Sequence, residues 1–238
     1  DTSTINKYKV SSDLMKKMRA SILVMGPLLA RFKKAEVALP GGCVIGARPI
    51  DYHLKLFARM GIDIQFSGEF LTASTSMIKS ARLILEYPSV GATENALMAA
   101  IMGSGPTQII NAAIEPEVLD LITVLRKMGA VINILPPATI EIYPANQLNP
   151  IEHEIMPDRL EAGSLLLAAS VTGGEILIPN APALLMDVFL LKLQEMGHSI
   201  AIGENGMGVW LKATKSPQAV SFKTMPYPGF PTDLQAPM

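Results

Sequence analysis

Three helix-like segments that end in Met-Gly recur at equal intervals along this 238-residue chain and constrain its fold more than any other feature. The pairs are Met60-Gly61, Met128-Gly129 and Met196-Gly197, 68 residues apart in both intervals. Each segment has a proline near its start and apolar residues at helical spacing. Proline suits the first turn of a helix and glycine suits its C-terminal cap. Equal spacing over two intervals indicates a true internal repeat.

The residues around these segments follow a common order. A short alternating run follows each glycine and predicts a strand, and a further helix is expected before each segment. The expected strands cover 62–66, 130–134 and 198–202, and the further helices 14–32, 92–102 and 160–171, with strands at 108–110 and 175–178 and loops at 39–42, 111–113 and 178–182. Solenoid modules repeat every ~20–45 residues. A period of 68 residues therefore favours an α/β protein built from larger repeated units.

Composition excludes several classes of protein. Hydrophobic residues make up 49% of the chain and charged residues 17%, which is typical of a globular protein with one large or two ordinary domains. A net charge of −1 gives no basic surface for nucleic acid or an anionic membrane, so neither is expected as a partner. The apolar stretch Ala20–Ala30 is shorter than the ~20 residues that span a bilayer. A polar, proline-bearing linker is expected at 143–157.

The loop at 39–49 holds the most reactive residue types. It contains three glycines, the only cysteine, Cys43, and Arg48. A thiol near an arginine and free backbone amides can have a lowered pKa and react. The alternative is a flexible loop with an incidental cysteine. A single cysteine excludes an internal disulfide and a cysteine-based zinc site, and no metal or other cofactor is expected.

Other polar residues have both a functional and a structural interpretation. Arg19 and Arg48 are candidate anion ligands, or simply solvated arginines. The run Ser89-Val-Gly-Ala-Thr93 before a helix suits a phosphate, or is an ordinary N-cap. Asp158 is expected to cap a helix. Asp233 follows a proline-rich turn with little else to explain it.

The histidines are expected to be structural. His53 and His198 belong to the repeats, and the three histidines of the chain show no metal-ligand spacing.

Seven motifs in this order resemble one family, the enolpyruvyl transferases that act on UDP-N-acetylglucosamine at the start of bacterial peptidoglycan synthesis. The motif around Cys43 is the most specific. The motifs are Met18-Arg-Ala-Ser-Ile22, Leu39-Pro-Gly-Gly-Cys-Val-Ile-Gly-Ala-Arg-Pro-Ile-Asp51, Ser89-Val-Gly-Ala-Thr93, Glu115-Pro-Glu117, Pro157-Asp-Arg159, Leu160-Glu-Ala-Gly163 and Phe230-Pro-Thr-Asp-Leu-Gln235.

The resemblance implies a fold of two inside-out α/β barrels, each made of three βαβαββ units, in agreement with the 68-residue period. Residues 1–156 would form most of the first domain, which carries the cysteine loop, and 157–238 the beginning of the second. The active site would lie between the two domains.

The implied reaction transfers the enolpyruvyl group of phosphoenolpyruvate to the 3-hydroxyl of UDP-N-acetylglucosamine and releases phosphate. By resemblance, Cys43 gives a proton to the methylene carbon and can form a covalent adduct, including with the epoxide antibiotic fosfomycin. A thiol with a pKa of ~8.5 suits this role. Asp233 matches the base for the sugar hydroxyl, and Arg48 a contact to the anionic reactant.

The same resemblance implies the residues that hold the nucleotide sugar. The uridine end would lie against residues 48–52, which are Arg48, Pro49, Ile50, Asp51 and Tyr52. Arg19 would contact the nucleotide sugar, and Ser89 and Val90 its diphosphate. Some members place a lysine two residues before that serine, where this chain has Tyr87, followed by Pro88. Part of the usual diphosphate charge pairing is therefore expected to be missing.

The resemblance implies a bacterial, cytoplasmic transferase that serves cell wall biogenesis, cell shape and cell division. The family also has a Lys-Asn pair near its N-terminus and arginines toward its C-terminus that clamp phosphoenolpyruvate, and neither has a counterpart here. The chain is therefore expected to be an internal portion that works with the remainder of the same enzyme and is a poor catalyst alone.

Three alternatives remain. The first is the sibling transferase acting on shikimate 3-phosphate, which shares the fold but not the cysteine loop. The second is a non-catalytic nucleotide-sugar-binding remnant. The third is a repeat scaffold that binds neither substrate.

Overall fold

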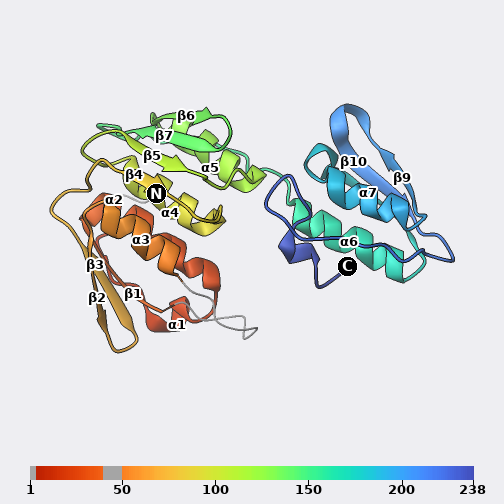
Figure 1. Cartoon of the computed structure of the whole chain (residues 1–238), viewed down its shortest axis with the longest axis horizontal. Coiled ribbons are helices and arrows are strands. Elements are labelled where there is room, and N and C mark those ends of the chain that lie inside the picture. Colours follow the sequence, from red (N-terminus) through yellow and green to blue (C-terminus); the bar gives the residue numbers. More distant parts are fainter. Residues whose placement is uncertain (1–3, 40–49) are drawn as a thin grey trace. The chain divides into compact units, whose positions relative to one another are not determined.

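The computed structural model describes residues 4–39 and 50–238 and contains two compact units, Asp1–His153 and Glu154–Met238 (Figure 1). The break between the units falls inside the stretch 143–157 that the sequence marks as a linker. Each unit has its own apolar core. The assignment of the two units to a first and a second transferase domain stays a prediction.

The first half of unit 1 ends in a three-stranded antiparallel sheet of order β1-β3-β2. Its helices, with η denoting a 3₁₀ helix, and its strands are α1 (Ser12–Met15), η1 (Arg19–Val24), α2 (Met25–Phe32), β1 (Lys34–Ala38), α3 (Asp51–Arg59), β2 (Asp63–Ser67) and β3 (Phe70–Ser74).

The second half of unit 1 forms a four-stranded sheet of order β4-β5-β7-β6. Strands β4 and β5 are parallel, and the other pairs are antiparallel. The elements are β4 (Arg82–Ile84), α4 (Val90–Ala100), β5 (Thr107–Ile110), α5 (Pro116–Lys127), β6 (Val131–Leu135) and β7 (Thr139–Tyr143).

Unit 2 contains one antiparallel sheet of order β8-β10-β9. Its elements are α6 (Arg159–Val171), β8 (Glu175–Pro182), η2 (Ala183–Leu185), α7 (Asp187–Glu195), β9 (Ser199–Ile202), η3 (Glu204–Gly206), β10 (Met207–Lys212) and η4 (Thr232–Leu234).

The expected repeat is present three times as helix, strand, helix, strand, strand: α2-β1-α3-β2-β3, α4-β5-α5-β6-β7 and α6-β8-α7-β9-β10. The Met-Gly pairs end the second helix of each repeat, with positive φ at Gly61 (75°), Gly129 (107°) and Gly197 (94°). In the first repeat the amide of Ile62 donates to Phe57 O at 3.1 Å, and the matching bonds in the other repeats measure 3.0 and 3.2 Å. These are Schellman motifs, in which glycine avoids the strain of a left-handed backbone.

The helix expected at 14–32 is wrong as a single element, because it is divided into α1, η1 and α2. Ser21 explains the break. Its hydroxyl donates to Met15 O at 2.9 Å and to Met18 O at 2.6 Å, and Met18 itself is extended. A side chain that bonds nearby carbonyls competes with the helical backbone.

The loop expected at 178–182 is also wrong, because strand β8 continues to Pro182. Pro182 pairs with Met207, and the register shifts before the next pair, Ile178 with Val209. An irregularity of this kind tolerates proline, which cannot donate a hydrogen bond to a neighbouring strand.

Within the described residues, no helix is long and apolar enough to cross a membrane.

Candidate functional site

The N-terminal ends of α3 and α4 meet η1 around the buried side chain of His53. His53 lies on α3 with 6% of its surface exposed, and its Nδ1 is 2.8 Å from Nδ2 of Asn95 on α4. Nδ2 of Asn95 also donates to Ile22 O in η1 at 3.1 Å. A Cβ placed on Gly91, in the first turn of α4, would lie 3.2 Å from Cε1 of His53. Three segments that are distant in the sequence therefore meet at one side chain.

Two of the sequence-predicted site residues act electrostatically on His53. Burial and, to a smaller extent, the positive charge of Arg19 lower the pKa of His53 to about 4, against the opposing effect of Asp51. The imidazole is therefore neutral at pH 7. The same interactions indicate that Arg19, at the start of η1, and Asp51, at the start of α3, are near it.

Ser89 caps the N-terminus of α4. Its hydroxyl accepts a hydrogen bond from the amide of Ala92 at 3.4 Å, which confirms the N-cap interpretation. The cap leaves the amides of Val90 and Gly91 at the positive end of an 11-residue helix. Such an end suits an anion, so the capping and phosphate-binding interpretations are compatible here. Tyr87, before the cap, is 51% exposed.

The first turn of α3 presents polar and aromatic groups together. Ile50, Asp51 and Tyr52 are half-buried. Nζ of Lys55 lies 3.5 Å from Oδ2 of Asp51 and 5.6 Å from the centre of the Tyr52 ring. This turn therefore offers an aromatic side chain and charges of both signs next to His53.

A group of carboxylates, Glu94, Glu115 and Glu117, lies between α4 and the start of α5. Burial, together with the smaller effect of the negative charges of Glu117 and Glu115, raises the pKa of Glu94 to about 7. The sequence singled out Glu115 but not Glu94. Nothing in the sequence marks Glu94, because its raised pKa depends on burial and on the nearness of Glu117 and Glu115, which arise only in the folded chain.

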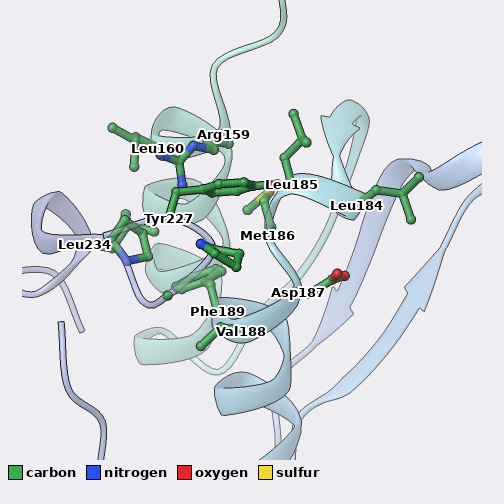
Figure 2. A pocket seen from close by; sticks show the side chains of 13 residues that line it. Arg159, Leu160, Leu184, Leu185, Met186, Asp187, Val188, Phe189, Tyr227 and Leu234 are labelled. Atoms are coloured by element: carbon green, nitrogen blue, oxygen red, sulfur yellow. The ribbon is translucent and has the colours of Figure 1, made fainter. Parts of the chain in front are cut away.

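Unit 2 contains a small, partly open hollow of about 30 Å³ (Figure 2). The guanidinium of Arg159 lies over the ring of Tyr227, 5.5 Å from its centre, in this hollow. Asp158, just before it, caps α6 by accepting from Leu160 N at 2.8 Å and Glu161 N at 3.1 Å, which confirms the predicted cap.

Asp233 lies exposed in η4, next to Leu234, which lines the hollow. A Cβ on Gly163 would be 2.7 Å from Cδ1 of Leu234. The motifs at 160–163 and 230–235 are therefore in contact within unit 2.

The structure brings together in unit 1 most of the predicted nucleotide-sugar residues: Arg19, Ile50, Asp51, Tyr52, Ser89 and Val90. Cys43, Arg48 and Pro49 lie outside the described residues. Pro88 lies between Tyr87 and Ser89, the N-cap residue of α4. Among residues 4–39 and 50–238, no group of three or more metal-ligand side chains is arranged to hold a metal ion.

The model of one protein family matches the whole chain, residues 1–238: EPSP synthase (3-phosphoshikimate 1-carboxyvinyltransferase). This chain belongs to the EPSP synthase family. Among solved structures of enolpyruvyl transferases, NikO from Streptomyces tendae matches with a TM-score of 0.77 and 19% identity over 90% of this chain and 52% of that one. An EPSP synthase from Acinetobacter baumannii matches with a TM-score of 0.60 and 17% identity, over 87% of this chain and 48% of that one. These structures confirm the predicted α/β fold of enolpyruvyl transferase type.

Closer relatives within the EPSP synthase family have the name UDP-N-acetylglucosamine 1-carboxyvinyltransferase, which confirms the resemblance seen in the sequence. The proteins from Geotalea uraniireducens and Geotalea daltonii are 46% and 48% identical over 236 residues. The Caldanaerobacter subterraneus protein is 47% identical over 234 residues. These matches cover 98–99% of this chain and 56% of each relative, so the chain spans little more than half their length.

Proposed function

We propose that this chain is part of an enzyme that transfers the enolpyruvyl group of phosphoenolpyruvate to the 3-hydroxyl of UDP-N-acetylglucosamine. The names of relatives at 45–48% identity support this substrate. The observation that carries the proposal is geometric. Residues assigned to the nucleotide sugar come from η1, α3 and α4, and these three elements adjoin at His53.

Unit 1 would bind the nucleotide sugar. The diphosphate would lie at the N-terminus of α4, where the amides of Val90 and Gly91 and the hydroxyl of Ser89 can donate to its oxygens. Arg19 would supply a positive charge, which this site needs because Tyr87 takes the place of a lysine. The first turn of α3, with Tyr52, would hold the uridine end.

The chemical steps would use Cys43 and Asp233. Cys43 gives its thiol proton to the methylene carbon of phosphoenolpyruvate, which makes the neighbouring carbon electrophilic. The sugar 3-oxygen attacks that carbon while Asp233 takes the hydroxyl proton. The Cys43 thiolate would then take a proton back from the new methyl carbon as phosphate leaves the neighbouring carbon, which restores the double bond and leaves the enolpyruvyl ether. Arg48 would hold the anionic reactant during these steps.

An enzyme with this activity would serve peptidoglycan synthesis, and through it cell wall biogenesis, cell shape and cell division, in the bacterial cytoplasm. Its thiol would also be the target of fosfomycin. Cys43→Asp would retain a proton donor but lose the thioether with fosfomycin, and mass spectrometry of the treated protein would detect either form. An adduct on that variant would contradict the role of Cys43.

Transfer to shikimate 3-phosphate is the second candidate, because the matching family model has that activity in its name. Calorimetric titration with UDP-N-acetylglucosamine and, separately, with shikimate 3-phosphate distinguishes the two. We expect only the nucleotide sugar to bind. Phosphate release with phosphoenolpyruvate, assayed in the same samples, distinguishes an active transferase from a piece that binds without turnover.

Arg19→Ala tests the geometry of the proposed site. Loss of one charged hydrogen bond, at about 1.5–3 kcal/mol, corresponds to about a tenfold or larger loss of nucleotide-sugar affinity. Arg82→Ala is the matched control, because Arg82 is exposed on β4 and outside this site. Equal affinities of the two variants would contradict the assignment of Arg19.

A further inference from the structure

The hydrogen bonds of Asn95 determine which ring nitrogen of His53 carries the proton. The amide of Gly26 is a donor, so the atom that faces it at 2.8 Å is the Asn95 carbonyl oxygen. The other end of the side chain is then Nδ2, which donates to Ile22 O at 3.1 Å. The same nitrogen lies 2.8 Å from Nδ1 of His53. Because Nδ2 can only donate, Nδ1 must accept, and the single proton of the neutral imidazole is on Nε2.

The protonated nitrogen of His53 lies beside the first turn of α4. A Cβ on Gly91 would be 3.5 Å from Nε2 and 3.2 Å from Cε1. The His53 residue is 94% buried, yet Nε2 has no hydrogen-bond partner among the described residues. In the described part of the chain, every fully enclosed side-chain nitrogen or oxygen has a hydrogen-bond partner. Nε2 of His53 has none there, so it is not fully enclosed and solvent or a ligand can reach it. The α4 N-terminus and this donor therefore form one site for an anionic oxygen.

We propose that His53 is a neutral hydrogen-bond donor to the anion at the N-terminus of α4, and that Asn95 is the positioning residue that sets this state. The inference rests on the proposed function, in which that anion is the diphosphate of the nucleotide sugar. A neutral donor contributes a directed hydrogen bond without a change of charge between about pH 5 and about pH 8. The charges that act on the ring are Arg19 on η1 and Asp51 on α3.

His198 in unit 2 gives a natural internal control. The amide of Thr214 donates to Nδ1 of His198 at 3.1 Å, so its proton is also on Nε2. There, however, Nε2 lies 2.7 Å from the hydroxyl of Ser170. The two histidines share one tautomer, but Nε2–H of His198 has Ser170 as its acceptor, whereas Nε2–H of His53 has no acceptor among the described residues. A ligand at α4 should therefore change the Nε2–H resonance of His53 and not that of His198.

The first experiment is NMR of the whole chain labelled with ¹⁵N-histidine, because ring-nitrogen shifts distinguish protonated from unprotonated sites. We expect Nδ1 to be unprotonated and Nε2 protonated in both His53 and His198. UDP-N-acetylglucosamine should then shift the Nε2 signal of His53 alone. A proton on Nδ1 of His53, or an unchanged His53 signal with the sugar nucleotide bound, would overturn the inference.

Calorimetry on the same sample separates this inference from the proposed function. If UDP-N-acetylglucosamine does not bind, both the proposed substrate and the donor role of His53 are overturned. The tautomer measured without ligand still decides whether Asn95 positions the ring proton. These readouts use the unaltered chain, so they do not depend on whether a variant folds.

Asn95→Asp provides the second experiment. A carboxylate accepts a proton from Nδ1, stabilises the imidazolium and raises the pKa of His53. Because a charged donor binds an anion more tightly, we expect about threefold or greater tighter binding of the sugar nucleotide at about pH 5 than at about pH 8. Asn111→Asp is the matched control, since Asn111 donates to Leu85 O at 2.9 Å and shares no hydrogen bond with His53. If Asn95→Asp binds the sugar nucleotide with the same affinity at about pH 5 and at about pH 8, Asn95 does not position the ring proton of His53.

Discussion

The backbone amide of Gly26 in α2 donates a hydrogen bond to Oδ1 of Asn95 in α4, 2.8 Å away. This contact joins the first helices of two successive repeats. A Cβ on Gly26 would lie 2.7 Å from the backbone oxygen of Asn95 and 2.9 Å from its Oδ1, so the close approach requires glycine. The same asparagine orients His53. Helix packing and the candidate site therefore depend on one side chain.

Gly26→Ala should destabilise unit 1, because the oxygens that its Cβ would meet are fixed by α4. We expect a loss of about 1–3 kcal/mol in the free energy of unfolding, as for other overpacked cores. Urea unfolding of the two proteins measures it. Gly105→Ala is the control, because its Cβ would meet only the Ser80 side chain, at 3.3 Å. Equal losses in both variants would contradict the close-packing explanation.

Glu94 should make unit 1 less stable as the pH rises from about 4.5 to about 7. The pKa of Glu94 is raised from 4.5 to about 7 in the folded protein, so in this interval the folded state binds more protons than the unfolded state. Stability then falls with rising pH, and the full penalty is present above about pH 7. Melting temperatures across this range should fall less for Glu94→Gln than for the unaltered chain.

The control for this experiment is Glu152→Gln, since Glu152 is exposed and outside the group formed by Glu94, Glu115 and Glu117. It should show the pH profile of the unaltered chain. If Glu94→Gln also shows that profile, burial does not raise the pKa of Glu94 in solution.

The aromatic residue of the Phe-Pro-Thr-Asp turn anchors Asp233 to the core of unit 2. Phe230 is 1% exposed, and its ring centre is 4.5 Å from that of Phe222 and 5.9 Å from that of Phe189. Phe230→Ala should lower the stability of unit 2 by about 3–5 kcal/mol, as for other buried aromatic residues. Calorimetric unfolding tests it. Phe66→Ala, at a residue 60% exposed on β2, should cost far less, and a comparable loss would show that Phe230 is not a core anchor.

Local rules predicted the repeated architecture. Proline at a helix start and glycine at its end depend on the backbone of a few neighbouring residues, so the Met-Gly pairs located all three second helices correctly. The wrong predictions, the single helix at 14–32 and the loop at 178–182, depend on hydrogen bonds and strand pairing that helix and strand propensities do not describe. The Ser21 hydroxyl donates to two backbone carbonyls and interrupts a helix. Pro182 pairs with Met207 next to a register shift, which the residues around Pro182 do not predict.

The candidate site was predicted in part. The motifs named Arg19, Asp51 and Ser89, and unit 1 places their elements together. Asn95 and Glu94 were missed because their roles come from residues that are far away in the sequence. His53 is 42 positions from Asn95, and only the packing of α3 on α4 makes them partners. His53 was expected to be structural, and its buried ring with a hydrogen bond to Asn95 agrees with that expectation, while the donor role of its Nε2 is our proposal.

The proposed place of Cys43 beside the nucleotide sugar is tested most directly by the rate at which an alkylating reagent modifies it, because it is the only cysteine of the chain. Mass spectrometry follows the modification with no ligand, with UDP-N-acetylglucosamine and with shikimate 3-phosphate. We expect the nucleotide sugar to slow alkylation severalfold and shikimate 3-phosphate to leave the rate unchanged. Protection by shikimate 3-phosphate, with none by UDP-N-acetylglucosamine, would contradict this expectation.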